Sequence, residues 1–198
     1  MSVIFGIKEE NQIIIAGDKR ETNKYNGQYS DDSDKVIIIN EHLAFASAGN
    51  TAMLTAIKME IDKIRDKEKM FTDDLLEIIK EFYKGLTEKK LTLLLSYPYC
   101  FVIGGKNRKN STSLFVGLNT KGGLSTQEAQ AYELALLPPD GLDRTVCNDI
   151  FLKKYNSGQT DFVEKTIYEI SEININVSPT GDKWIYNIKQ EKGVLHTF

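Results

Sequence analysis

Four residues in the first quarter of the chain have the types and spacing to carry out acyl transfer: Ser2, Asp18, Lys35 and Gly49. Methionine is normally removed when the second residue is small, so Ser2 is expected to become the N-terminus. It would then hold a hydroxyl nucleophile and an α-amine on one residue. Because the reference pKa of such an amine is about 7.7–8.0, a useful fraction is neutral near pH 7 and can accept the proton of the hydroxyl.

The other three residues each have a role that matches their position. Asp18 ends an apolar run, and antiparallel pairing of that run with the first strand would bring it close to Ser2. Lys35 begins another apolar run, and a desolvated ammonium there would disfavour a second positive charge on the amine and favour an alkoxide. Lys35 would itself need Asp18 as its counter-ion. Gly49 lies where a strand gives way to a helix, and backbone N–H groups at such a junction can form an oxyanion hole.

The elements that must position these residues are legible in the hydrophobic pattern. Groups of apolar runs with the length of strands alternate along the chain with pairs of segments that have the pattern of helices. In the first pair, apolar residues recur at helical spacing on one face and polar residues lie on the other. Strands are predicted at 3–7, 12–18, 35–40, 42–49, 99–106, 112–119 and 183–188, and helices at 51–67, 72–86, 142–158 and 160–173. Near-continuous Ile and Val runs favour strands that are covered on both faces. The order predicts an α+β fold: a four-layer αββα sandwich of two mostly antiparallel sheets flanked by helices, in a single domain of residues 1–198.

Composition excludes several classes of protein. The net charge is −3, and no basic stripe for nucleic acid is visible. The apolar runs fall short of the roughly 20 residues of a membrane span, and the N-terminus lacks the pattern of a signal peptide. We therefore expect a cytoplasmic protein that binds neither nucleic acid nor membrane. Cys100 and Cys147 are expected to be buried free thiols. No metal or cofactor is predicted, and the acidic "SDDSD" (30–34) is interpreted as a solvated turn in preference to a cation site.

With these residues in place, the N-terminal block resembles the proteasome β-subunit family, which includes the HslV protease subunit and belongs to the N-terminal nucleophile (Ntn) hydrolases. The family has an A-x-D-x-R-x-T pattern whose Asp lies sixteen residues after the nucleophile, and "AGDKRET" keeps that distance from Ser2. The lysine comes seventeen residues after Asp18 where the family has sixteen, and Ala48-Gly49 follows without a further gap. The resemblance is specific from Ser2 to about Leu54, and beyond that it is one of element order.

The resemblance implies the fold of the Ntn hydrolases and a site. Ser2 is the expected nucleophile, Asp18 and Lys35 tune it, and the Gly49 N–H binds the oxyanion. Thr22 and Arg20 are the expected substrate-binding residues, with Thr22 holding a peptide backbone by strand addition. The family also implies a peptide or protein substrate and a homo-oligomer, either a ring or a dimer. Any ATPase partner stays unknown.

Several departures from the family pattern leave alternatives open. The nucleophile is Ser where the family has Thr, and the family's G-S-G motif is missing near "PPDG" (138–141). The late D-x-x-S-G-G motif has only a weak counterpart in 176–182, with Ser178, Thr180 and Gly181 as candidates. The favoured interpretation is a serine- or threonine-type Ntn peptidase. The alternatives are a catalytically inactive proteasome-like scaffold subunit and an Ntn amidase that acts on small molecules.

Overall fold

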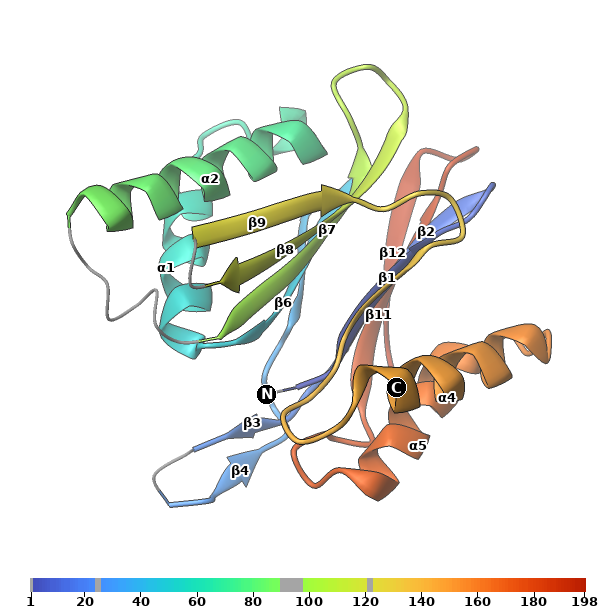
Figure 1. The fold of residues 1–198 in the computed structure, drawn as a ribbon. Coiled ribbons are helices and arrows are strands. Elements are labelled where there is room, and N and C mark those ends of the chain that lie inside the picture. Colours follow the sequence, from blue (N-terminus) through green and yellow to red (C-terminus); the bar gives the residue numbers. More distant parts are fainter. Residues whose placement is uncertain (1, 24–25, 90–97, 121–122) are drawn as a thin grey trace.

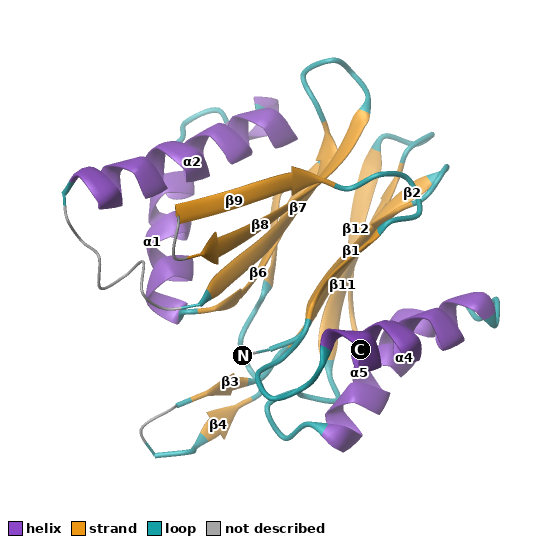
Figure 2. Ribbon diagram, in the orientation of Figure 1, coloured by secondary structure: helices purple, strands orange, loops and turns teal. Residues whose placement is uncertain are grey.

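The computed structural model of the chain describes residues 2–23, 26–89, 98–120 and 123–198 (Figure 1). Within these ranges it contains two five-stranded sheets, a small two-stranded sheet and four α-helices, coloured by type in Figure 2. The strand pairs are all antiparallel among the described residues. The mixed α/β composition and the antiparallel sheets predicted from the sequence are therefore confirmed.

The first sheet has the strand order β10-β1-β2-β11-β12. Its strands are β1 (Ile4–Lys8), β2 (Gln12–Asp18), β10 (Leu134–Leu137), β11 (Gly181–Asn187) and β12 (Lys192–Thr197). The pairing of β1 with β2 sets Ile4 opposite Gly17, which brings the end of β2 beside the start of the chain. This is the proximity that the sequence predicted for Asp18 and Ser2.

The second sheet has the order β5-β6-β7-β8-β9. Its strands are β5 (Val36–Asn40), β6 (Leu43–Gly49), β7 (Tyr99–Lys106), β8 (Thr112–Thr120) and β9 (Gly123–Glu128). The polar segment between β2 and β5 forms the small pair β3 (Glu21–Thr22) and β4 (Tyr29–Ser30). In Figure 1 this pair projects below the N-terminus.

The apolar side chains of each strand alternate between two clusters. In β2, Ile13 and Ile15 join a cluster that also contains Val102 and Leu114 from the other sheet, so this cluster lies between the sheets. Ile14, from the opposite face of β2, joins a cluster with the helices α4 (Arg144–Asn156) and α5 (Phe162–Ile173). Because both faces of the strand are covered, its isoleucines form an unbroken run instead of alternating with polar residues.

The other pair of helices covers the second sheet in the same way. Helices α1 (Thr51–Asp62) and α2 (Thr72–Glu88) share a cluster with the face of β6 and β7 that carries Phe45 and Phe101. Figure 1 shows the two helix pairs on opposite sides of the molecule, with the sheets between them. A short 3-10 helix, Lys67–Lys69, joins α1 to α2.

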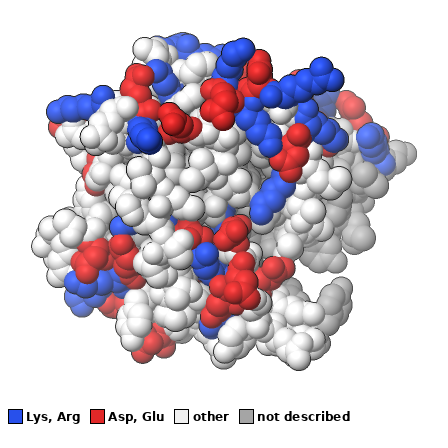
Figure 3. Space-filling view, turned by 180° about the vertical axis from the view of Figure 1, so that it is seen from behind, with Lys and Arg blue, Asp and Glu red and all other residues white. Residues whose placement is uncertain are grey.

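The surface seen in Figure 3 carries basic and acidic side chains interspersed, with no continuous basic stripe among the described residues on that face. None of the helices in the described ranges is long and apolar enough to span a membrane. Cys100 and Cys147 are buried free thiols, as expected. Burial raises the pKa of the Cys100 thiol to about 12 and that of Cys147 to about 11, so neither is a reactive thiolate near neutral pH.

Candidate active site

Asp18 is the structural centre of the site. It ends β2, its exposed fraction is 0%, and its carboxylate accepts three backbone hydrogen bonds. Oδ1 accepts from Val3 N at 2.9 Å, and Oδ2 accepts from Arg20 N at 2.9 Å and from Ser178 N at 3.1 Å. Burial raises the pKa of Asp18, while Lys35 and the backbone donors oppose that shift. Asp18 therefore joins the N-terminal strand, the turn after β2 and the segment before β11.

Lys35 lies against Asp18 just before β5, and it is 5% exposed. Its Nζ donates to the carbonyl oxygens of Asp18 at 2.8 Å and Arg20 at 2.7 Å, and it lies 3.3 Å from Asp18 Oδ2. Burial lowers the pKa of Lys35, and the attraction of Asp18 opposes this shift. The three oxygen contacts use the three donors of an ammonium, so the geometry suits a charged Lys35 that is held in one place.

Ser2 is next to this ammonium. It is 7% exposed, and its Oγ donates to Arg20 O at 2.9 Å. Lys35 Nζ donates to the same carbonyl oxygen, so the hydroxyl and the ammonium occupy adjacent positions around one acceptor. The structure thus brings Ser2, Asp18 and Lys35 together, as the spacing of the sequence predicted. Their catalytic roles stay predictions.

Gly49 lies at the end of β6 in a conformation that only glycine adopts readily, with φ at +111°. A Cβ atom there would come within 2.3 Å of Pro98 O. The next residue, Asn50, is the N-cap of α1, and its side chain accepts a hydrogen bond from Ala52 N. Glycine at position 49 therefore lets the end of β6 lie close against Pro98, beside the site and at the start of a helix whose dipole favours negative charge.

The two predicted substrate-binding residues lie at the site in different situations. Thr22 is in β3, paired with Tyr29, and lines the pocket described below. The Arg20 guanidinium is already engaged: it binds Asp31 through two contacts of 2.7 Å, donates to Ile175 O at 2.8 Å and stacks over Tyr29 at 4.0 Å. Its arrangement favours an anchoring role for the side chain, while its carbonyl oxygen serves Ser2 and Lys35.

The segment 176–182, the weak counterpart of the family's late D-x-x-S-G-G motif, reaches the site. Ser178 is fully buried and donates its backbone N–H to Asp18, and its Oγ lies 2.9 Å from Thr180 Oγ1. Gly181 opens β11 directly opposite Asp18. A Cβ atom on Gly181 would lie 2.7 Å from Gly17 O, so glycine lets the two strands approach here. Ser178 and Gly181 therefore contact Asp18, which lies behind Ser2, and neither they nor Thr180 line the pocket described below.

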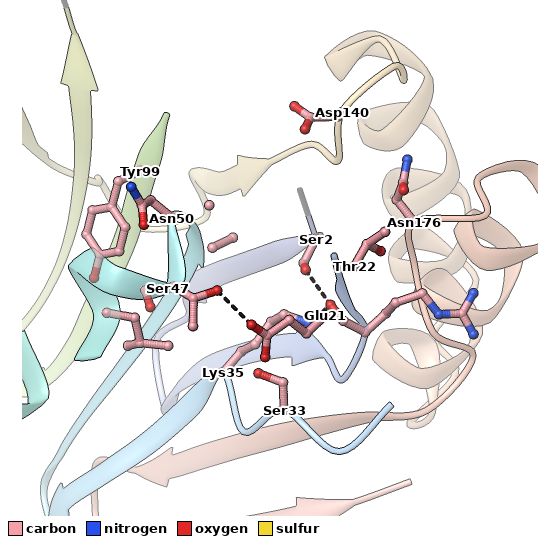
Figure 4. A pocket seen from close by; sticks show the side chains of 15 residues that line it. Ser2, Glu21, Thr22, Ser33, Lys35, Ser47, Asn50, Tyr99, Asp140 and Asn176 are labelled. Carbon is pink, nitrogen blue, oxygen red and sulfur yellow. Dashed lines mark hydrogen bonds between the residues drawn. The ribbon is translucent and has the colours of Figure 1, made fainter. Parts of the chain in front are cut away.

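A pocket of about 110 Å³ opens beside Ser2 (Figure 4). Lys35 and Gly49 also line it. Sequence reasoning missed most of its other residues, which come from β3, the end of β6, the start of α1, β7 and the three loops that precede β5, α4 and β11. They are Glu21, Ser33, Ser47, Ala48, Asn50, Thr51, Leu54, Tyr99, Asp140 and Asn176. Asn50 and Thr51 had a usable signal, since they directly follow Gly49. Tyr99, Asp140 and Asn176 had none, because only the fold brings them to the site.

Within the described residues, no group of three or more His, Cys, Asp or Glu side chains has the arrangement of a metal site. Asp31, from the acidic "SDDSD" segment, is committed to Arg20, and Asp34 pairs with Lys19 at 3.3 Å. The hydrogen bonds from the Arg20 guanidinium lower the pKa of Asp31, and partial burial opposes this shift. This acidic segment therefore contributes to ion pairs with the residues that follow β2.

Comparison with known families agrees with this geometry. The family model described as "Proteasome subunit" matches residues 2–90, which include Ser2, Asp18, Lys35 and Gly49. The resemblance found in the sequence, to proteasome-like Ntn hydrolases, is therefore supported by an independent match over the same block. At the level of the family the match indicates a hydrolase. A search of curated proteins gave no match.

Proposed function

We propose that this chain is a proteasome-like Ntn hydrolase, a peptidase that cleaves amide bonds through Ser2 after removal of Met1. The observation that carries the proposal is the convergence of Ser2 and Lys35 on one carbonyl oxygen, with Asp18 behind them and the pocket in front. The two sheets with helices outside them are consistent with the αββα sandwich of the Ntn fold in a single domain of residues 1–198.

In the proposed reaction, Ser2 Oγ attacks the carbonyl carbon of the substrate amide. The proton of the hydroxyl passes to the α-amine of Ser2, and the backbone N–H of Gly49 donates to the oxyanion. When the C–N bond breaks, the departing amine takes that proton and leaves an ester on Ser2. Water then hydrolyses the ester, which releases the acid and restores the hydroxyl. The Lys35 ammonium disfavours protonation of the nearby amine, so more of it is available as a base.

The substrate is proposed to be a peptide or protein segment, which Thr22 would hold by backbone hydrogen bonds along β3.

We propose a cytoplasmic homo-oligomer, as is typical of proteasome subunits. Exposed apolar side chains on α4 and α5, among them Leu152, Tyr168 and Ile173, are candidates for its contacts. Light scattering that gives a mass of one chain, 22.4 kDa, at all concentrations would count against an oligomer.

Two measurements test the catalytic proposal together. Mass spectrometry of purified protein should show the chain beginning at Ser2, and fluorogenic peptides should be hydrolysed. Ser2→Ala should reduce turnover by at least about 1,000-fold, since it removes the nucleophile. Ser157→Ala, at an exposed serine at the end of α4, is the matched control and should leave turnover unchanged. Equal activity of Ser2→Ala and the wild type, or full activity with Met1 retained, would refute the proposal.

A catalytically inactive scaffold subunit is the second candidate. It is favoured by the state of the Ser2 hydroxyl, which donates to a carbonyl oxygen that cannot act as a base. If Met1 is retained, the α-amine is absent as well. Retention of Met1 together with the absence of any hydrolysis would support this candidate.

A small-molecule Ntn amidase is the third candidate, and the modest pocket volume of about 110 Å³ favours it. It shares the first half of the site and the Ser2 chemistry. Hydrolysis of simple acyl amides at rates above those for peptides, lost in Ser2→Ala, would distinguish it from a peptidase.

A further inference from the structure

The side chain of Glu21 extends from β3 toward the start of α1, and both elements line the pocket beside Ser2. A single contact fixes this direction: Glu21 Oε1 accepts a hydrogen bond at 2.8 Å from Thr51 Oγ1, thirty residues further along the chain. Figure 4 marks this hydrogen bond with a dashed line. Because the N-terminal end of a helix favours negative charge, the carboxylate is stabilised at the pocket instead of extending into bulk water.

The Glu21 carboxylate is accessible and has no cation bound to it. The residue is exposed, and its hydrogen bond comes from a neutral hydroxyl. A carboxylate offers about four acceptor positions on its two oxygen atoms, so a further donor can bind beside Thr51. Among the ion pairs formed by the described residues, none includes Glu21.

The two cations in the pocket lining are each paired with another acid. Lys35 Nζ lies 3.3 Å from Asp18 Oδ2, and the Arg20 guanidinium binds Asp31 at 2.7 Å. Glu21 also attracts Lys35, but less strongly than Asp18 does. Since Asp18 and Asp31 balance the two cations, the charge of Glu21 remains as an excess. The pocket therefore favours a cationic group over an anionic one.

We propose that this pocket takes a positively charged side chain of the substrate, that of lysine or arginine, whose head group pairs with Glu21. The inference rests on the proposed function, because it places that side chain beside the amide that Ser2 attacks. The apolar stem packs on Leu54, which is half-buried and follows Thr51 by three residues on the same side of α1. An acidic side chain meets repulsion from Glu21 and from Asp140, the other acid in the lining.

Binding measured separately from hydrolysis tests the inference. Isothermal titration calorimetry with the Ser2→Ala protein compares two acetylated tripeptide amides that end in lysine and in norleucine, whose side chains differ in the ammonium alone. The lysine peptide should bind about 5-fold more tightly at low salt, a ratio suited to a pair at an exposed carboxylate. Because salt screens such a pair, the ratio should fall toward 1 at about 0.5 M salt.

Variants of Glu21 in the same Ser2→Ala background assign the effect to one carboxylate. Glu21→Gln keeps an acceptor for Thr51 but removes the charge, so the two peptides should bind equally. Glu21→Lys should reverse the preference, so that a peptide ending in glutamate binds more tightly than the lysine peptide. Glu68→Gln is the matched control: Glu68 is exposed in the 3-10 helix and lies outside the pocket lining, so the same change in net charge should leave the ratio unchanged.

Equal binding of the lysine and norleucine peptides, tighter binding of the norleucine peptide, or no binding of either would overturn the inference. A lysine preference that survives in Glu21→Gln would also overturn it. If the lysine peptide binds selectively but the wild-type protein hydrolyses no peptide, the inference stands and the proposed catalytic function fails. If the wild type hydrolyses peptides through Ser2 with no preference for lysine or arginine, the catalytic function stands and the inference fails.

Discussion

At the scale of single residues, the unusual feature is an ammonium held inside the protein beside a serine hydroxyl. Lys35 Nζ contacts three oxygen atoms, which belong to Asp18 and Arg20. A lysine in such a place costs free energy through desolvation, and the shift of its pKa below the usual value records that cost. Buried charged groups that are held in one position are often found at functional sites. The electrostatic role of Lys35 is therefore worth testing.

Replacing Lys35 by Met should lower kcat/KM by about 100-fold or more and move the pH profile. In the wild type, the positive charge lowers the pKa of the Ser2 amine, so activity should rise at lower pH than in the variant. With Met, that pKa should return toward about 7.7–8.0, and the acidic limb should shift to higher pH by about one unit. On the basic side, wild-type activity should fall as pH rises through the lowered pKa of Lys35, below 10.5, and the variant should lack this limb.

A pH–rate profile of kcat/KM measures both limbs. Asp18 would be left buried without its cation in Lys35→Met, so the double variant with Asp18→Asn is the control for damage to the fold. An acidic limb that stays in place in a folded Lys35→Met protein would contradict the electrostatic role.

At the scale of elements, the β3–β4 pair is fastened by one arginine. Arg20 binds Asp31 through two parallel contacts, donates to Ile175 O and stacks on Tyr29 of β4. The same residue presents the carbonyl oxygen that receives Ser2 and Lys35. The geometry of the nucleophile therefore depends on an ion pair whose acidic member comes from a segment that the sequence suggested was only a solvated turn.

Asp31→Asn should destabilise the protein by about 1 kcal/mol at pH 7 and by much less at pH 3. The hydrogen bonds from Arg20 lower the pKa of Asp31 in the folded state below the usual 3.8. The pair therefore contributes its full stability above about pH 4, and that contribution is lost as the pH falls through the lowered pKa. Urea unfolding at the two pH values measures the difference, with Asp32→Asn as the exposed neighbour for comparison. A destabilisation that is the same at both pH values would not fit an ion pair.

At the scale of the whole molecule, the two sheets approach closely at Gly104 in β7. A Cβ atom there would lie 2.8 Å from Ile15 Cδ1 and 3.0 Å from Ile13 Cγ2, both of which belong to β2 in the other sheet. The close approach lets the inter-sheet cluster form with no gap at this point. It also couples the sheet that carries Asp18 to the sheet that carries Gly49.

Gly104→Val should therefore destabilise the protein by about 1–3 kcal/mol, because its methyl groups would force the sheets apart or the isoleucines into strained rotamers. Gly85→Ala is the matched control. Gly85 lies in α2, and a Cβ atom there has nothing within 4 Å, so alanine should stabilise the helix by about 0.5–1 kcal/mol. Urea denaturation measures both. Equal stability of Gly104→Val and the wild type would show that the interface between the sheets can relax.

The sequence by itself determined the local elements and the first block of the site. Unbroken Ile runs predicted strands covered on both faces, and the distances between Ser2, Asp18, Lys35 and Gly49 predicted their association. Hairpin pairing is local, so the neighbourhood of Ser2 and Asp18 could be read from adjacent strands. The start of α2 shows the limit of local signals. Threonine is a common N-cap residue, yet Thr72 is the first residue inside the helix, and the N-cap is Phe71, whose N–H donates to Asp74 Oδ2 at 2.7 Å.

Only the tertiary structure decided which distant segments complete the site. β10 and β11 join the sheet of β1 and β2 from more than 100 residues away, and with β11 come Ser178 and its hydrogen bond to Asp18. Tyr99 reaches the pocket because β7 pairs with β6. Such pairings depend on which partner buries the most apolar surface and satisfies the backbone, and no single segment carries that information.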